Sequence, residues 1–179
     1  MTVTIEPAAM LAAPLTALKT YLAISLDDED EALADLIRAA SEVAERYIGQ
    51  LLIARTVTQI LGVRSGWQKL AIRPVTGIIA VDGLPADGAA FALPADSYGT
   101  EIDAGGTGRI RIAMPGAAGR VRVRYTAGMA SDAAGVPDAI RHGIIRLAGE
   151  YHARREGLEP DPPASVIALW RPWRRVQLA

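Results

Sequence analysis

The chain has 179 residues, half of them apolar and 22% charged, which is enough for one ordinary domain with a substantial core. It contains no cysteine, which excludes disulfide bonds, thiol catalysis and cysteine-ligated metals. No apolar run reaches about 18 residues, and the N-terminus lacks the pattern of a secretory signal, so we expect a cytoplasmic protein without membrane contact.

The net charge of −1 hides an uneven distribution along the chain. Residues 1–50 contain three basic and nine acidic groups, whereas residues 51–136 and 137–179 have net charges of +3 and +2. An acidic front and a basic remainder suit head-to-tail contacts between copies of the chain. The alternative is that the acidic block is only the solvated start of a helix.

The first 52 residues predict two helices. Pro14 opens a short one, because a proline in the first helical turn gives up only an N–H that has no partner there. We expect Asp28 and Glu31 to begin the second helix as a capping box, and Gly49 to end it. Its apolar stripe at helical spacing consists of Leu33, Leu36, Ile37, Ala40, Ala44, Tyr47 and Ile48.

From Arg55 the apolar period changes to two, which is typical of strands. The expected strands are RTVTQILGV, WQKLAIR, TGIIAVDG, AAFAL, SYGTEI, GRIRIAM and GRVRVRYTAG. Asp82-Gly83 predicts a tight turn. AGGTGR, residues 104–109, predicts a hairpin turn and not a phosphate loop, because it lacks the Gly-Lys-Ser/Thr ending and the strand-to-helix context. We expect an antiparallel, sandwich-like or barrel-like β module over residues 53–127.

A helix returns at Pro137 and should fade by Gly157, and three prolines in residues 158–163 predict a stiff linker before a last short helix, ASVIALW. The predicted fold class is α+β. Its parts are N-terminal helices in 1–52, the β module in 53–127, a helix in 128–157 that packs on the first helices, and a linker with a docking arm in 158–179. Residues 1–157 would form one core domain.

The sequence contains no catalytic constellation. His142 and His152 lie on one expected helix, about 15 Å apart along its axis, so they cannot readily share a metal. The acidic run 27–31 lacks the glycine and the alternating ligands of a calcium loop, and helix capping accounts for it. We therefore expect no enzyme, no cofactor and no metal site.

Two strands alternate arginine with apolar residues, which places the arginines on one face of each strand. If the strands pair, five arginines share one sheet face and favour an anionic partner, either DNA or an acidic face of a neighbouring subunit. The alternative is a solvent-exposed face. A small nucleic-acid-binding module is accordingly the second functional hypothesis. The residues are Arg109, Arg111, Arg120, Arg122 and Arg124.

The C-terminal peptide LWRPWRRVQLA combines two tryptophans with three arginines. These residue types are enriched at interface hot spots, so a peptide of this kind after a proline-rich linker suits an arm that binds another protein. The alternative is that the segment folds back on its own domain. Membrane anchoring is disfavoured, because the segment is short and its basic charge is modest.

The order of these elements resembles a known family, the head–tail connector (adaptor) proteins of long-tailed phages. The N-terminal match is LTALKTYLAISLDDEDEALADLIRAASEVAERYIGQLLIART: a Leu-Lys-x-Tyr-Leu helix, an acidic turn, a long Ala-rich helix and an aromatic-x-Gly before the strands. VPDAIRHGIIRLAGEYHARRE is similar to the later helix of the family, and SVIALWRPWRRVQL to its ending. The preference for arginine over lysine is compatible with the related adaptors of gene transfer agents.

The resemblance implies a structural protein of the virion, assembled in the bacterial cytoplasm. Such adaptors form a ring, usually dodecameric, that joins the portal to the stopper and tail proteins and leaves a channel for DNA. The family docks its C-terminal segment on the portal. In this chain that role falls on Trp170, Arg171, Trp173, Arg174 and Arg175, whereas the strand arginines match no family motif.

Overall fold

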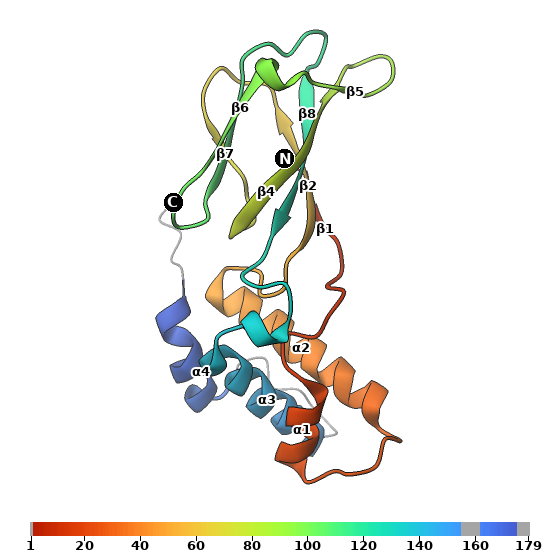
Figure 1. Cartoon of the computed structure of the whole chain (residues 1–179), viewed down its shortest axis with the longest axis vertical. Coiled ribbons are helices and arrows are strands. Elements are labelled where there is room, and N and C mark those ends of the chain that lie inside the picture. Colours follow the sequence, from red (N-terminus) through yellow and green to blue (C-terminus); the bar gives the residue numbers. More distant parts are fainter. Residues whose placement is uncertain (1, 155–161, 175–179) are drawn as a thin grey trace. The chain divides into compact units, whose positions relative to one another are not determined.

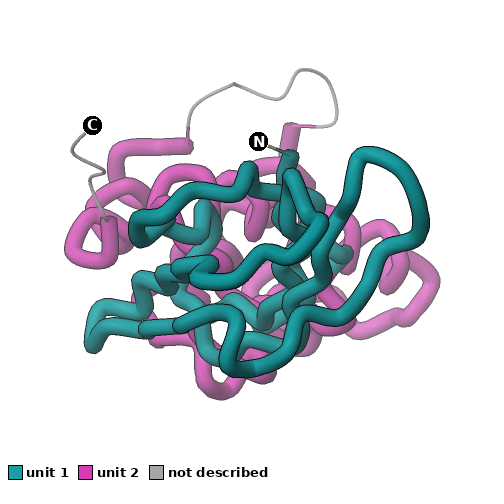
Figure 2. The backbone as a smooth tube through the Cα atoms, turned by 90° about the horizontal axis from the view of Figure 1, so that it is seen from above, with its two compact units in different colours: residues 1–7, 54–128 teal, residues 8–53, 129–179 magenta. Residues whose placement is uncertain are grey.

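A computed structural model describes residues 2–154 and 162–174 of the chain. The chain forms two compact units: residues 1–7 and 54–128 make the β unit, and residues 8–53 and 129–179 make the helical unit. Figure 2 colours the β unit teal and the helical unit magenta. The α+β class, with N-terminal helices, central antiparallel strands and C-terminal helices, is confirmed.

The helical unit contains the expected helices α1 (Leu15–Leu22), α2 (Asp30–Ile48), α3 (Asp138–Ala153) and α4 (Ala164–Trp170) (Figure 1). Three of them begin directly after a proline, at Pro14, Pro137 and Pro163, whose fixed φ and missing N–H suit a helix start. Gly49 ends α2 in the left-handed conformation, at φ 75°, as expected. Helix α3 contacts α1, α2 and α4 and so lies at the centre of this unit.

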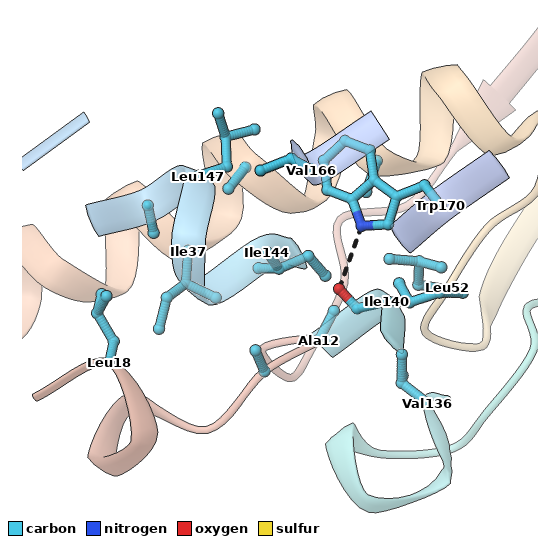
Figure 3. Close-up of a cluster of buried hydrophobic side chains, with 14 of the residues drawn as sticks. Ala12, Leu18, Ile37, Leu52, Val136, Ile140, Ile144, Leu147, Val166 and Trp170 are labelled. Atoms are coloured by element: carbon cyan, nitrogen blue, oxygen red, sulfur yellow. Dashed lines mark hydrogen bonds between the residues drawn. The ribbon is translucent and has the colours of Figure 1, made fainter. Parts of the chain in front are cut away.

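The apolar faces of these helices form one core (Figure 3). The stripe on α2 behaves as its spacing predicts: five of its seven residues are buried, and Leu36 and Tyr47 are partly buried. The loop before α1 and the start of α3 also contribute small or branched side chains. The large buried side chains of the core are Leu18, Leu33, Ile37, Ile48, Leu52, Ile140, Ile144, Leu147 and Trp170.

The β unit contains two antiparallel sheets. The five-stranded sheet has the order β1 (Thr2–Ile5), β2 (Arg55–Gly62), β8 (Arg120–Ala127), β4 (Val75–Leu84), β5 (Phe91–Ala92). The three-stranded sheet has the order β3 (Gln68–Lys69), β7 (Gly108–Ile112), β6 (Tyr98–Ile102). Alternate residues of β2, β7 and β8 are buried, so each sheet has one face turned inward.

Three details of the strand predictions are corrected. Asp82 and Gly83 do not form a turn: they lie inside β4, opposite Arg122 and Val121 of β8. Gly83 is required there because a Cβ would come within 2.6 Å of the Phe91 ring. The glycine that predicted a tight turn is instead needed for close packing against Phe91.

The stretch expected as a strand at 67–73 is extended only at β3. The next backbone N–H groups are bound by side chains: Gln59 Oε1 accepts from Ala71 at 2.9 Å, and the Tyr125 hydroxyl accepts from Ile72 at 3.2 Å. The N-terminal β1 was not expected, although Thr-Val-Thr-Ile has the alternation of a strand; it pairs with β2. The turn at 104–109 is confirmed as the β6–β7 hairpin.

Candidate functional site

The C-terminal segment of the helical unit packs against its own core. Trp170, the last residue of α4, is fully buried, and its Nε1 donates a hydrogen bond to the Ile140 carbonyl at 3.3 Å (Figure 3). Tyr47 of α2 lies beside it, with 6.1 Å between the ring centroids and 45° between the planes. A buried indole with its N–H bonded is typical of a core anchor.

Gly143 makes room for this indole. A Cβ at position 143 would lie 2.3 Å from Trp170 Nε1, closer than any side chain tolerates, and the nearest atoms are all in the ring. The ring therefore lies directly against the backbone of α3. This contact holds the C-terminal end of α4 against α3, and so determines the position of the residues that follow it.

The residues after Trp170 form a short 3-10 turn, η3 (Arg171–Trp173), on the surface of the unit. Trp173 is 39% exposed, and Arg171 and Arg174 are also exposed. Two side chains contact this turn, one from the last part of α2 and one from just after the helix. Gln50 Nε2 donates a hydrogen bond to the Trp173 carbonyl at 3.2 Å, and the Arg174 guanidinium lies 5.2 Å from the centre of the Tyr47 ring.

The five predicted portal-binding residues are thus of two kinds. Trp170 is part of the core, whereas Arg171, Trp173 and Arg174 lie on the surface beside it. Arg175 and most of the expected linker lie outside the described residues. Their assignment to portal binding stays a prediction. The sequence did not point to Gln50, and it marked Tyr47 only as part of an apolar stripe.

The five strand arginines do not share one sheet face. Alternation is confirmed within each strand, since Ile110, Ile112, Val121, Val123 and Tyr125 are buried. However, β7 and β8 belong to different sheets: β8 pairs with β2 and β4, and β7 pairs with β3 and β6. The expected joint face of five arginines is therefore wrong, because it depended on pairing of these two strands.

Several of these arginines also have partners within the β unit. The buried carboxylate of Asp82 binds Arg122, at 3.0 Å from Nε and 2.9 Å from Nη2, and lies 3.9 Å from Nε of Arg124. Glu101 lies 3.9 Å from Arg109. The Arg111 guanidinium lies 5.3 Å from the centre of the exposed Trp67 ring. The two carboxylates of Asp82 and Glu101 therefore offset part of the positive charge that binding to a DNA backbone would use.

The acidic turn between α1 and α2 is held by a lysine. Lys19 Nζ donates to Asp27 at 2.5 Å and to Asp30 at 2.7 Å. These interactions raise the pKa of Lys19, and the lysine lowers the pKa of the Asp27 carboxyl. The expected capping box is wrong: Glu29 occupies the cap position of α2, and it makes no side-chain cap hydrogen bond.

Other chemistry-bearing residues do not form a second site in the part of the chain that the structure describes. His142 and His152 both lie on α3, as expected, and His152 Nε2 lies 3.3 Å from Glu29 Oε2. Within residues 2–154 and 162–174, no cluster of three His, Asp or Glu side chains is arranged to hold a metal ion. No helix in these ranges is long and apolar enough to cross a bilayer.

Comparison with known proteins gives a consistent result. Residues 13–73 match the model of a family described as phage gp6-like head-tail connector proteins. The fold is similar to a chain in the neck of an empty GTA particle computed with C6 symmetry, with a TM-score of 0.81, 26% identity, and coverage of 100% of this chain and 98% of the other. No curated protein matches the chain.

Two further structures match over the same shares of both chains and with the same identity. One is the virion of a native gene transfer agent (GTA) particle, with a TM-score of 0.78, and the other is the neck of a native GTA particle computed with C12 symmetry, with a TM-score of 0.74. The resemblance predicted from the sequence, to head–tail connectors and to those of gene transfer agents, is confirmed.

Proposed function

We propose that this chain, a structural protein of the head–tail connector type, is built into the neck of a phage or gene-transfer-agent particle as a ring. The observation that supports this most is similarity over the full length of the chain, at 26% identity, to a chain of a GTA neck. A ring of twelve copies agrees with the C12 symmetry of one of the similar necks. The ring joins the portal to the stopper or tail proteins and surrounds a channel through which DNA passes.

The portal contact belongs to the C-terminal segment. Arg171, Trp173 and Arg174 are exposed within four consecutive residues, and the buried Trp170 directly before them anchors this segment to the core. Arg175 extends the same basic stretch. An exposed tryptophan between arginines is the composition of an interface hot spot and gives no catalytic group, so we propose a binding role and no enzymatic one.

The strand arginines face neighbours in the ring or the channel. Arg111, Arg120 and Arg124 are exposed, and the acidic turn of a neighbouring copy offers complementary charge. Because Asp82 and Glu101 neutralise part of this arginine charge, DNA contacts in the channel would be weak and independent of sequence.

The experiment that tests the proposal is reconstitution of the neck. The purified chain is mixed with the portal protein of the same particle and imaged by electron microscopy, with native mass spectrometry for the number of copies. A ring on the portal, with about twelve copies, supports the proposal. Failure of the full-length chain to bind portal, in conditions where the portal itself is an intact ring, contradicts it.

A further inference from the structure

We infer that Tyr47 and Gln50 hold Arg171, Trp173 and Arg174 as one preorganised surface, here called the tail face, which binds an acidic segment of the partner that also carries an apolar side chain. The inference rests on the proposed function, since it names the chemistry of the portal segment that the tail face binds. It differs from a free docking peptide, because the binding residues would need the body of the helical unit behind them.

The backbone of the tail face is fixed at both ends. At its start, Trp170 is buried against Gly143 and bonded to the Ile140 carbonyl. At its end, the Trp173 carbonyl accepts from Gln50 Nε2, and the Gln50 side chain is itself almost fully buried. Pro172 lies between them and restricts φ of the turn. Binding therefore requires little further ordering of this backbone, and preorganisation of this kind favours affinity.

One side chain of the tail face, that of Arg174, lies over an aromatic ring of the helical unit. The Tyr47 ring contacts both the buried Trp170 and the exposed Arg174. Packing against Trp170 therefore holds the ring in place, and the ring in turn positions the guanidinium of Arg174. The Arg174 guanidinium carbon lies 5.2 Å from the centre of that ring, and a guanidinium that contacts a ring can still donate to a carboxylate. Arg171 and Arg174 have no ion-pair partner among residues 2–154 and 162–174.

The charge of the segment indicates the chemistry of the partner. Residues 162–174 include Arg171 and Arg174 but no acidic residue. Glu45, two residues before Tyr47 on α2, accepts a hydrogen bond from the Leu52 backbone N–H at 2.9 Å. The unpaired arginines favour carboxylates, and the half-exposed indole of Trp173 favours an apolar side chain beside them.

A nucleic acid is the less suitable occupant. Two exposed arginines neutralise only about two phosphates, which supplies weak binding at physiological salt. The tail face instead combines few charges with an aromatic ring, which is the composition of protein interface anchors. The occupant we propose is therefore an acidic, partly apolar segment of another protein.

The first test uses a defined probe with the full-length protein. A fluorescent peptide of alternating Glu and Leu residues is titrated with the chain and followed by anisotropy, beside a Gln/Leu peptide and a short DNA duplex. We expect the Glu/Leu peptide to bind about ten-fold more tightly than the other two probes. Equal binding of the Gln/Leu peptide, or tighter binding of the duplex, would overturn the inference.

The second test asks whether Tyr47 positions Arg174. Arg174→Ala should weaken peptide binding about ten-fold and Tyr47→Leu about three-fold, whereas Tyr47→Phe, which keeps the ring, should remain near wild type. In a double-mutant cycle the two losses should be less than additive, because Tyr47 acts through Arg174. Additive losses, or equal effects of the Phe and Leu variants, would contradict a positioning role.

Arg38→Ala is the matched control, since it removes an exposed arginine of α2 that lies beside Asp35 and far along the helix from Tyr47. It should leave peptide binding unchanged. The same variants are then mixed with portal. If wild-type protein binds portal and Tyr47→Leu binds equally well, the tail face is wrong and the proposed function stands; if wild-type protein does not bind portal, the proposed function itself fails.

Discussion

Trp170 lies directly over Gly143, so closely that a Cβ on the glycine would come within 2.3 Å of the indole nitrogen. Gly143→Ala should therefore destabilise the helical unit by about 1–3 kcal/mol, because the buried ring cannot move away and the contact is overpacked. This is the net loss: the gain in helix propensity from replacing a helical glycine, about 1 kcal/mol, has already been subtracted from the cost of overpacking. Urea unfolding followed by tryptophan fluorescence measures it.

Gly149 of the same helix is the matched control. A Cβ there would come within 2.6 Å of Tyr21, but that side chain is largely exposed and can turn toward solvent. Gly149→Ala should therefore be neutral or slightly stabilising. Equal destabilisation by the two substitutions would show that the Trp170 contact is not what makes Gly143 necessary.

Tyr125 joins the strands of the β unit through a buried hydroxyl, which donates to Gln59 Oε1 at 3.1 Å and accepts from Ile72 N–H at 3.2 Å. Tyr125→Phe should cost about 1–2 kcal/mol at neutral pH, because the Ile72 N–H loses its partner. Burial raises the pKa of Tyr125 above its ordinary value of 10.0. The neutral phenol therefore contributes stability that is intact below about pH 10 and is lost as the pH rises through the raised pKa.

The Phe variant should accordingly show a shallower loss of stability above about pH 10 than the wild type. Its slope should not vanish, since burial also raises the pKa of Tyr151. Chemical unfolding at a series of alkaline pH values gives both slopes. Parallel profiles for the two proteins would contradict a raised pKa at Tyr125.

The elements that could be predicted from the sequence are those set by local chemistry. The stripe from Leu33 to Ile48 and the prolines before α1, α3 and α4 depend only on spacing and on the fixed φ of proline. The hairpin at 104–109 similarly depends on turn residues, including Asp103, whose carboxylate accepts from Gly105 and Thr107.

The arrangements that could not be predicted depend on residues far apart in the chain. Strand alternation shows which residues of β7 and β8 turn inward, but it does not show which strands pair. Gly83 resembled a turn residue because packing against Phe91 and a positive φ both require glycine. The burial of Trp170 depends on Gly143, and no local pattern connects these two positions.

Lys19 holds the acidic turn before α2 by binding Asp27 and Asp30. Lys19→Met should lower the melting temperature at neutral pH and low salt, since the two carboxylates lose their partner. The lysine lowers the pKa of Asp27, so the pair contributes stability that is present above the ordinary aspartate pKa of 3.8 and is lost as the pH falls through the lowered value. Wild type and variant should therefore converge in acid.

Arg38→Met serves as the control for this substitution, because Arg38 pairs with Asp35 on an exposed part of α2. Exposed pairs of this kind contribute little, so its melting temperature should change less. Added salt should reduce the difference between wild type and Lys19→Met. A difference that persists unchanged in acid and in high salt would assign the effect of Lys19 to packing of its aliphatic stem.

Asp82 forms an ion pair with Arg122 and lies 3.9 Å from Arg124, and Asp82→Asn removes this negative charge from beside the two arginines. The β unit should lose about 1–2 kcal/mol, less than for a fully buried pair because Arg122 is partly exposed. The variant should also bind duplex DNA more tightly than wild type at low salt, since two arginines become available for phosphates. Glu101→Gln, whose carboxylate is 3.9 Å from Arg109, should have a smaller effect on both measurements. Tight, steeply salt-dependent DNA binding by the wild type would instead favour a nucleic-acid-binding module over a connector.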